Sequence, residues 1–315
     1  KKIDPFIVNV TGEWTEKKEK LRNINIINLF HKPYFKNLPK GGIIYSRISQ
    51  ILIFIFNFIK LKNLLKQNKP DYFVAHLIIS LPLLLFFLFS FETKLILRIS
   101  GTPKLNFLRK FFWSKFSKKV YFITCPTLSS YNTLKNLGIF PVNKLKLLYD
   151  PIISINKISK NKNKEIDNFL KNKEYILSIG RLTKQKNFTL LIKSFNEIKK
   201  KLPDINLVIL GEGEERTKLE NLVSSFKLSS SVFMPGYKSN VFNFLNNSKC
   251  FISSSLYEDP GFSLIEAGSI NKIVIAPDTK TGPSEILDES NRGFLFKKND
   301  FSSLVEKFFE FYYSN

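Results

Sequence analysis

The strongest constraint on the fold is a regular alternation of short apolar runs and amphipathic stretches in the second half of the chain. The apolar runs start at residues 175–180 and continue to 273–276, and each has the length of a strand. Between them, apolar residues recur at helical spacing, as in residues 187–201. Strands that alternate with helices form a parallel sheet covered on both faces. The pattern therefore predicts an α/β fold whose strand ends share one edge.

The first half is less regular, although strand-like runs alternate with helix-like stretches there too. Residues 13–22 look helical, 31–42 look rich in turns, and 154–173 are polar and rich in lysine. A polar, lysine-rich stretch between two patterned halves is typical of a linker. We therefore predict an N-terminal domain at 1–153, a linker at 154–173 and a C-terminal domain at 174–315.

The positive charge of the chain is concentrated in its first half. The net charge is +23, and residues 1–150 hold 25 Lys and Arg against 7 Asp and Glu. Such a charge predicts an anionic partner, with nucleic acid and an anionic membrane surface as the usual candidates. Alternatively, a coding bias toward lysine, phenylalanine and asparagine would explain the positive charge without any partner.

Two segments of the first half favour the membrane over nucleic acid. Residues 77–91 are the most apolar run, but this run is shorter than the ~20 residues that span a bilayer. A helix packed inside the domain is therefore expected. The alternative is a segment that dips into the bilayer surface. Residues 104–119 interleave six basic with five aromatic residues. Bulky aromatics suit an anionic membrane face better than a double helix, so no nucleic-acid partner is expected.

The two cysteines and the first residue carry little information. Cys125 and Cys250 lie far apart and have no metal-type spacing, which predicts buried thiols in a reducing compartment. The chain starts at Lys1, so a fragment that lacks the first N-terminal strand is expected.

Four loops follow predicted strands and should gather at one edge of the sheet. In the first, residues 180–186, Arg181 and Lys186 could reach one diphosphate, or the loop is simply a solvated basic loop. The second, Gly211-Glu-Gly213, predicts a tight turn with close backbone approach, because Arg216 occupies the place of a third glycine. The third, Pro235-Gly-Tyr237, predicts a turn whose main chain could face a nucleobase.

The fourth loop, residues 252–268, carries two carboxylates, Glu258 and Glu266, with seven residues between them. It combines a strand end, a serine-rich loop and a helix start, where unpaired amides attract anions. Two carboxylates there could hold hydroxyl groups on either side of a bound phosphate. The alternative is structural, since Ser263 and Glu266 also fit a capping box.

Together these motifs resemble the nucleotide-sugar domain of glycosyltransferase family 4. The resemblance covers about residues 174–300 and rests on ordered motifs: Gly180-Arg-Leu with Lys186-Asn, Leu210-Gly-Glu-Gly213, Pro235-Gly236, Glu258-x7-Glu266-Ala, Gly282-Pro-Ser-Glu285 and Gly293. It implies the GT-B fold, two Rossmann-like doubly wound domains with the active site in the cleft between them. It also implies an EC 2.4 hexosyl- or N-acetylhexosaminyltransferase that retains the anomeric configuration.

The resemblance also implies a role for each motif residue. Arg181 and Lys186 would neutralise the diphosphate in place of a metal, Glu266 would hold the ribose, and Glu258 would hold the donor sugar. His76 matches the active-site histidine in kind and location, with a structural histidine at a strand end as the alternative. The donor loops would supply Gly180, Gly211, Gly213, Pro235, Gly236, Tyr237 and Gly261, with the amides of Phe262, Ser263 and Leu264 on the diphosphate. One departure is Asp259-Pro260, where many members have Gly-Phe.

The expected function is therefore transfer of a sugar from a nucleotide-sugar donor to a lipid-linked or glycan acceptor in surface polysaccharide or glycolipid synthesis. A UDP-sugar is favoured over a GDP-sugar, no cofactor or metal is expected, and the protein is expected on the cytoplasmic face of the membrane. The alternatives are a sugar-nucleotide epimerase of the same architecture and a basic nucleic-acid-binding protein.

Overall fold

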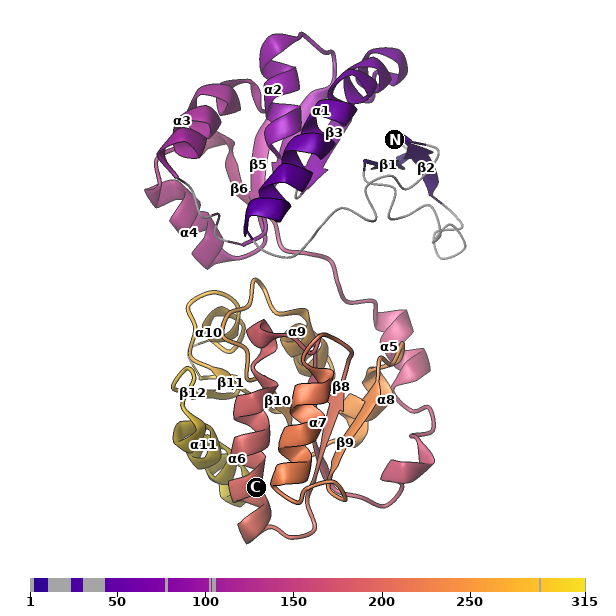
Figure 1. Ribbon diagram of the computed structural model, residues 1–315, viewed down its shortest axis with the longest axis vertical. Coiled ribbons are helices and arrows are strands. Elements are labelled where there is room, and N and C mark those ends of the chain that lie inside the picture. The colour runs from indigo at the N-terminus through magenta and orange to yellow at the C-terminus, as the bar shows by residue number, and fades with distance from the viewer. Residues whose placement is uncertain are drawn as a thin grey trace. The chain divides into compact units, whose positions relative to one another are not determined.

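The computed structural model describes residues 3–10, 24–30, 43–76, 79–101, 103, 106–288 and 290–314 (Figure 1). The predicted helix at 13–22 and the turn-rich segment at 31–42 lie outside these residues. The chain forms two compact units. The first contains residues 1–99, 104–124 and 137–146, and the second contains residues 100–103, 125–136 and 147–315. Each unit has its own sheet, as the alternating pattern predicts.

The sheet of the N-terminal half has four strands in chain order. The strands are β3 (Tyr72–His76), β4 (Lys94–Arg98), β5 (Phe122–Cys125) and β6 (Leu145–Leu147). The helices of this half are α1 (Ile43–Asn68), α2 (Ser80–Leu88), α3 (Phe107–Phe116) and α4 (Leu128–Asn136). The pairs β3–β4 and β4–β5 are parallel, so the carboxyl ends of these strands, including His76, lie at one edge.

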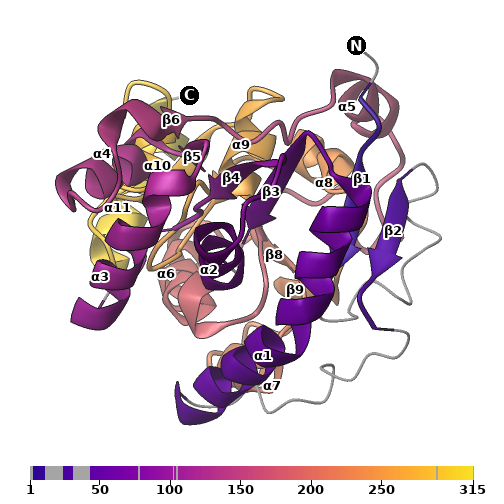
Figure 2. The same cartoon turned by 90° about the horizontal axis from the view of Figure 1, so that it is seen from above.

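A short parallel pair, β1 (Phe6–Asn9) and β2 (Asn25–Asn28), lies beside α1 in both ribbon views (Figure 2). The Nζ of Lys60 on α1 donates a hydrogen bond to the carbonyl of Leu29, 2.9 Å away, and lies 3.5 Å from the centre of the Phe30 ring. These contacts join α1 to the segment after β2.

Within the apolar run predicted at 77–91, residues 80–88 form α2, which packs inside its unit. Leu81, Leu83 and Leu85 on α2 are buried, as expected for a packed helix. No helix among the described residues has both the length and the apolar character needed to cross a bilayer.

The sheet of the C-terminal half has the strand order β12-β11-β10-β7-β8-β9, and every recorded pair is parallel. Its strands are β7 (Tyr175–Ile179), β8 (Asn206–Leu210), β9 (Val232–Gly236), β10 (Phe251–Ile252), β11 (Val274–Pro277) and β12 (Phe294–Phe296). The chain runs outward from β7 to β9, then returns and runs the other way from β10 to β12. The order therefore reverses between β7 and β10, which pair directly through Leu177 and Phe251. In sheets of this kind, ligands bind where the order reverses, beyond the carboxyl ends of the strands.

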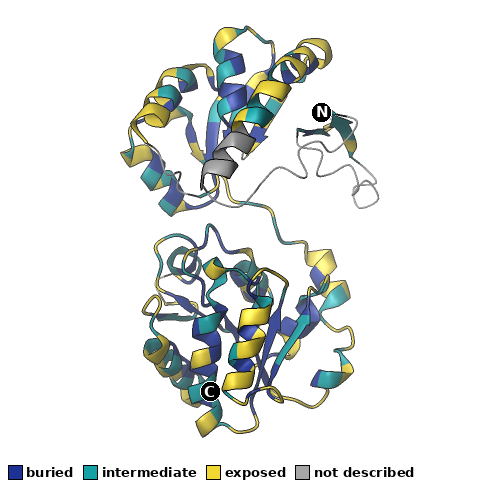
Figure 3. Ribbon diagram, in the orientation of Figure 1, coloured by how far each residue is buried: buried dark blue, intermediate teal, exposed yellow. Residues whose placement is uncertain are grey.

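The helices of this half cover both faces of the sheet and create two apolar cores (Figure 3). They are α5 (Ile155–Asn161), α6 (Phe188–Lys201), α7 (Arg216–Ser225), α8 (Phe242–Asn247), α9 (Phe262–Gly268), α10 (Pro283–Ile286) and α11 (Phe301–Ser314), with 3-10 turns η4 (Asn168–Leu170) and η5 (Lys184–Lys186). Within the predicted linker at 154–173, Ile158 of α5 and Leu170 of η4 are buried in one of these cores. The division of the chain into domains at 153 and 174 stays a prediction.

Candidate functional site

The loops that follow β7 and β10 are tied together at the point where the strand order reverses. The amide of Leu256 donates to the carbonyl of Gln185 over 2.8 Å, and Nε2 of Gln185 donates to the carbonyl of Tyr257 over 3.0 Å. The hydroxyl of Ser254 donates to the carbonyl of Lys186 over 2.8 Å. The basic loop and the serine-rich loop, far apart in sequence, therefore form one structure.

A pocket of about 340 Å³ opens over these two loops. It brings together eight of the residues predicted from sequence: Gly180, Arg181, Lys186, Glu258, Gly261, Phe262, Ser263 and Glu266. Its other lining residues are Ile179, Gln185, Asp259 and Pro260. Gln185 could have been found from sequence, because it lies between two lysines of the quoted loop. Six predicted residues do not line this pocket: Gly211, Gly213, Pro235, Gly236, Tyr237 and Leu264. His76 lies in the other unit, at the end of β3.

Glu258 and Lys186 form an ion pair in the wall of the pocket. The side chain of Lys186 is 17% exposed and that of Glu258 is 7% exposed. The Nζ of Lys186 donates to Oε1 of Glu258, and the hydroxyl of Ser255 donates to the same oxygen over 2.6 Å. Among the described residues, Oε2 of Glu258 has no recorded hydrogen-bond partner. A buried carboxylate is stable only when charged and polar partners compensate its desolvation, and these two donors do so.

Ser255 was not predicted as a site residue. It is buried, and its oxygen accepts a hydrogen bond from the buried hydroxyl of Ser253 over 3.3 Å. The signal in the sequence is three consecutive serines directly after an apolar strand, because buried hydroxyl groups need partners.

Glycine at position 180 allows Lys186 to cross the end of β7. A Cβ atom at Gly180 would lie 3.0 Å from Cε of Lys186, tighter than ordinary contact. Arg181, the next residue, is exposed and lines the pocket. Within the part of the chain that the structure describes, Arg181 has no carboxylate partner. Its guanidinium is thus the more available of the two predicted phosphate-binding cations, because Lys186 is paired with Glu258.

Glu266 lies on α9, is half-buried and also lines the pocket. Burial raises the pKa of the Glu266 carboxyl above its ordinary value, and the positive charge of Lys157 opposes this rise. Lys157 lies on α5, in the segment predicted to be a linker. A carboxylate that is partly shielded from water favours partners that donate hydrogen bonds, such as sugar hydroxyls.

The capping-box interpretation of Ser263 and Glu266 is wrong. Helix α9 begins at Phe262 with Gly261 as its N-cap, and no side chain caps it. Gly261 has a φ of 101°, in the left-handed region that favours glycine, and a Cβ there would lie 2.9 Å from Cδ1 of Leu264. The amide of Leu264 donates to the carbonyl of Gly261 over 3.1 Å, so this amide is used inside the helix.

The close backbone approach predicted at residues 211–213 is confirmed and supports the basic loop, whereas the turn itself lies slightly later, at residues 214–215. Gly211 has a φ of 145°, and a Cβ there would lie 1.9 Å from the carbonyl oxygen of Gly180. A Cβ at Gly213 would lie 2.3 Å from the carbonyl oxygen of Leu182, whose amide donates to the carbonyl of Glu212 over 2.9 Å. These glycines therefore let two backbones touch, and neither contributes to the pocket wall.

The third loop continues this arrangement. Gly236 ends β9 with a φ of 84°, and a Cβ there would lie 2.6 Å from Oε1 of Glu212. Tyr237, the next residue, is 75% exposed. The predicted turn is wrong for Pro235 and Gly236, which belong to strand β9. An exposed ring has a free face, which is the requirement for stacking on a base, so the base-facing role of this segment stays a prediction.

Asp259 replaces the glycine of the family pattern and is held by α4. In the second unit, which includes residues 125–136, the hydroxyls of Thr127 and Ser130 donate to the Asp259 carboxylate over 2.9 and 2.5 Å. Glu285 accepts hydrogen bonds from the amides of Leu128 and Ser129 over 2.7 and 3.1 Å. These bonds satisfy amides at the start of α4 and fix the reshaped loop on this helix.

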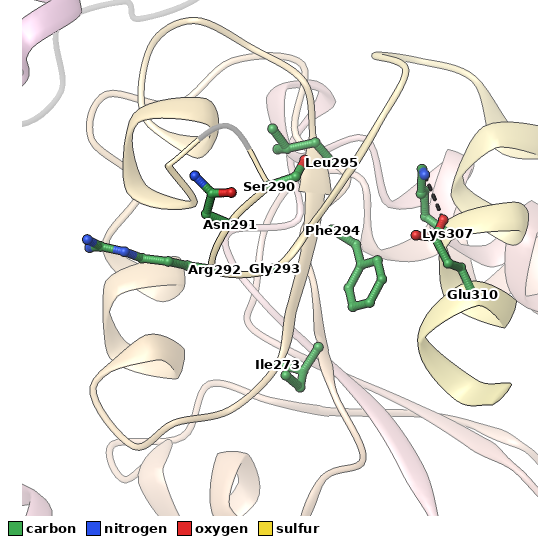
Figure 4. A pocket seen from close by; sticks show the side chains of 9 residues that line it. All are labelled: Ile273, Ser290, Asn291, Arg292, Gly293, Phe294, Leu295, Lys307 and Glu310. Carbon is green, nitrogen blue, oxygen red and sulfur yellow. Dashed lines mark hydrogen bonds and ion pairs between the residues drawn. The ribbon is translucent and has the colours of Figure 1, made fainter. Parts of the chain in front are cut away.

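A larger pocket, of about 420 Å³, lies elsewhere in the same unit, between β12 and α11 (Figure 4). Its charged groups are the exposed Arg292 and the ion pair between Lys307 and Glu310, whose atoms are 2.6 Å apart. Gly293 is its only residue from the quoted motifs, and a Cβ there would lie 2.6 Å from the carbonyl oxygen of Val274. This glycine serves packing, so the chemistry belongs to the smaller pocket.

No group of three His, Cys, Asp or Glu side chains comes together as a metal site in the described ranges. The expectation that the reaction needs no metal stays a prediction.

Comparison with known proteins identifies the family. The model of the glycosyl transferases group 1 family matches residues 159–313. An uncharacterized glycosyltransferase of Methanocaldococcus jannaschii is 31% identical over 287 residues, which cover 82% of this chain and 70% of the relative. The chain belongs to the glycosyl transferases group 1 family. The predicted family and the predicted GT-B fold are thus confirmed.

Two further similarities of this group 1 glycosyltransferase are informative. The N-acetylgalactosamine-N,N'-diacetylbacillosaminyl-diphospho-undecaprenol 4-alpha-N-acetylgalactosaminyltransferase of Campylobacter jejuni is 26% identical over 283 residues, 86% of this chain and 71% of the relative. The solved structure of Anabaena HepE in complex with UDP-glucose has a TM-score of 0.66 at 16% identity, covering 94% of this chain and 78% of HepE. At that identity the second similarity shows the shared fold.

Proposed function

We propose that this glycosyltransferase moves a sugar from a nucleoside diphosphate sugar to an acceptor hydroxyl, with retention of the anomeric configuration. The observation that carries the proposal is the buried pair of Lys186 and Glu258, which faces one pocket with Arg181 and Glu266 at the reversal point of the sheet. Two cations and two carboxylates that line one pocket match the chemistry of a diphosphate between two sugars.

The proposed roles divide the pocket into three parts. Arg181, which is exposed, and Lys186 stabilise the negative charge that develops on the departing diphosphate. Glu266 accepts hydrogen bonds from the ribose, and Glu258 holds hydroxyls of the donor sugar. The acceptor attacks on the face from which the diphosphate leaves, and the cationic side chains take the place of a metal ion.

In the N-terminal half we propose His76 as an active-site group. It is exposed at the carboxyl end of β3, and its neighbour across the sheet is Arg98. Strand ends at this edge carry functional groups in α/β folds.

We further propose a UDP-sugar donor, hexose or N-acetylhexosamine, and a lipid-linked glycan acceptor at the cytoplasmic face of a membrane. HepE was solved with UDP-glucose, and the name of the C. jejuni relative contains a diphospho-undecaprenol, a lipid-linked group. The basic character of residues 1–150 supports an anionic surface as the working site.

A thermal-shift screen of UDP-, GDP- and ADP-sugars tests the donor site. We expect a UDP-sugar to raise the melting temperature of the wild type, because a ligand that binds only the folded state stabilises it. The increase should be lost in Glu266→Ala and kept in Glu306→Ala, an exposed carboxylate on α11. Stabilisation by none of the three donors, or an equal increase in Glu266→Ala, would overturn the assignment.

Product analysis separates transfer from epimerisation. With donor and a lipid-linked acceptor, we expect a glycosylated acceptor whose new linkage has the anomeric configuration of the donor, read from the NMR coupling of the anomeric proton. Release of an epimerised sugar without any acceptor would show an epimerase instead.

A further inference from the structure

Helix α3 has an unusual distribution of apolar side chains. Its first half is exposed at every position from Asn106 to Phe111. Phe107 is 82% exposed, Leu108 is 73% exposed and Phe111 is 61% exposed. Large apolar side chains that cluster on a surface mark interaction sites, whereas single exposed ones are ordinary.

The second half of α3 is firmly packed. Trp113 is buried, and its ring centre lies 5.8 Å from that of Phe140. Phe116 packs on Phe87 of α2 with ring centres 4.3 Å apart. At the other end, the side chain of Asn106 accepts a hydrogen bond from the amide of Arg109 over 2.9 Å and caps the helix. The exposed turn is thus a rigid projection from the unit.

Charge surrounds this apolar projection and has one sign. From residue 93 to residue 149 the chain holds 11 Lys and Arg residues and not one Asp or Glu. Arg109, Lys110 and Lys115 lie on α3, and Lys118 and Lys119 follow in the next turn, all of them exposed. Basic side chains that flank exposed aromatic and leucine side chains match the interfacial region of an anionic bilayer, where head groups attract the charges and acyl chains accept the apolar groups.

We propose that α3 docks this protein on the surface of an anionic phospholipid bilayer, with Phe107, Leu108 and Phe111 inserted below the head groups and Arg109 and Lys110 bound to lipid phosphates. The inference rests on the proposed function in one respect, since it identifies the element that places the enzyme at a lipid-linked acceptor.

The position of α3 in the fold agrees with this role. Helix α3 follows β4, and β4 pairs in parallel with β3, whose last residue is His76. The start of α3 and His76 therefore belong to the same edge of the sheet, beyond the carboxyl ends of the strands. Docking through α3 brings that edge to the bilayer, where the hydroxyl of a lipid-linked acceptor is presented.

The exposed aromatic side chains favour a bilayer over nucleic acid. Contacts with duplex phosphates are made by basic and polar side chains, and they gain nothing from a protruding phenylalanine or leucine. A bilayer uses both kinds of group, so binding should depend on charge and on apolar insertion separately.

Vesicle cosedimentation with the full chain tests the inference. The probes are phosphatidylcholine vesicles with and without phosphatidylglycerol, at low and at high salt. We expect binding only to the anionic vesicles, weakened by salt. Arg109→Gln with Lys110→Gln should weaken it about tenfold or more, and Phe107→Ser with Phe111→Ser should weaken it to a similar extent.

Matched controls lie outside α3. Lys297→Gln with Lys298→Gln removes two exposed charges, and Ile155→Ser with Tyr313→Ser removes two exposed apolar side chains, both in the second unit. These variants should bind vesicles like the wild type. UDP-dependent thermal shifts, measured on every variant, should be unchanged and show that the α3 variants are folded.

The following results would overturn the inference. They are equal binding to neutral and anionic vesicles, unchanged binding by both α3 variants, and salt-sensitive binding to a DNA duplex that is lost in the charge variant but kept in the Phe107→Ser, Phe111→Ser variant. A wild type that shifts with a UDP-sugar but ignores anionic vesicles would refute the docking role and leave the proposed transferase standing. A wild type that binds anionic vesicles but is stabilised by no donor would refute the proposed transferase and leave the docking role of α3 standing.

Discussion

One carboxylate oxygen of Glu258, Oε1, accepts hydrogen bonds from two donors of different kinds. Lys186 supplies charge and Ser255 supplies a neutral hydroxyl, both in buried surroundings. A lysine on a flexible stem does not fix the orientation of a carboxylate, whereas a short, buried serine does. Ser255 therefore helps to decide where Oε2 of Glu258 points, and Lys186 supplies the charge that compensates the buried carboxylate.

Replacing Ser255 by alanine should lower kcat/KM about tenfold, since a hydrogen bond to a charged group is worth roughly 1.5–3 kcal/mol. Ser178→Ala is the matched control. Ser178 is equally buried, and its hydroxyl donates to the carbonyl of Ile252 over 2.6 Å, away from Glu258. In denaturant titrations, Ser178→Ala should lose about 1 kcal/mol of stability and Ser255→Ala roughly 1.5–3 kcal/mol. An equal loss of kcat/KM in both would mean that Ser255 has only a structural role.

Donor binding should weaken as the pH falls through the raised pKa of Glu266. The ionised carboxylate accepts hydrogen bonds, and burial makes Glu266 take up its proton at a higher pH than an ordinary glutamate. The KM for the donor should therefore rise on acidification, with an inflection above ~4.3, the ordinary value for glutamate. Kinetics across the acidic range measure this. The inflection should vanish in Glu266→Gln and persist in Glu306→Gln.

The same shift predicts the sign of a stability effect. A carboxyl whose folded pKa is raised favours folding when it is protonated, and this contribution is lost as the pH rises through the folded pKa. At neutral pH the ionised, half-buried Glu266 therefore costs stability. Glu266→Gln should raise the melting temperature while it abolishes the donor-induced shift. A lower melting temperature at neutral pH would contradict the burial argument.

At the scale of elements, the site depends on backbone contact between loops. The turn after β8 supports the basic loop after β7, because Gly211 and Gly213 leave room for the carbonyls of Gly180 and Leu182. The glycines of the motif therefore support the backbone of the basic loop and do not line the pocket themselves.

Gly211→Ala should be destabilising, because its φ of 145° is strained for any other residue and its Cβ would lie 1.9 Å from the Gly180 oxygen. We expect a loss of about 2 kcal/mol or more and a weaker donor-induced shift, since the displaced loop carries Arg181. Gly268→Ala is the control. It ends α9, has nothing within 4 Å of its Cβ, and should be neutral or stabilising. Equal stability of the two variants in urea titrations would refute this account.

Sequence patterns predicted the elements whose apolar residues recur regularly and missed those fixed by neighbours. The alternation gave the strands from β7 to β11, and the charged or glycine-rich loops gave most of the pocket. The start of α9 was misread, because Ser263 fits a capping box while the left-handed Gly261 decides the cap. The partners of Asp259 on α4 lie about 130 residues earlier in the chain, and no local pattern encodes such a distance.

At the scale of the whole molecule, the chain has two larger sheets besides the short β1–β2 pair. Among the described residues, most fully buried side chains belong to the C-terminal sheet and its helices, which hold two apolar cores. Among the described residues, more large apolar side chains are exposed in the N-terminal half than in the C-terminal half, as on α3. Because buried apolar area is the main stabilising contribution, the two sheets should differ in stability.

The two cysteines allow this difference to be measured. Cys125 ends β5 of the N-terminal sheet, Cys250 precedes β10 of the C-terminal sheet, and both are buried. Burial also raises the pKa of the Cys250 thiol, so little thiolate forms in the folded state. Neither thiol should react with Ellman's reagent in the native protein, and both should react in concentrated guanidinium chloride.

In single-cysteine variants, Cys250→Ser reports on Cys125 and Cys125→Ser reports on Cys250. We expect Cys125 to become reactive at a lower denaturant concentration than Cys250, since its sheet has the smaller core. Coincident midpoints would mean that the two sheets unfold as one cooperative unit.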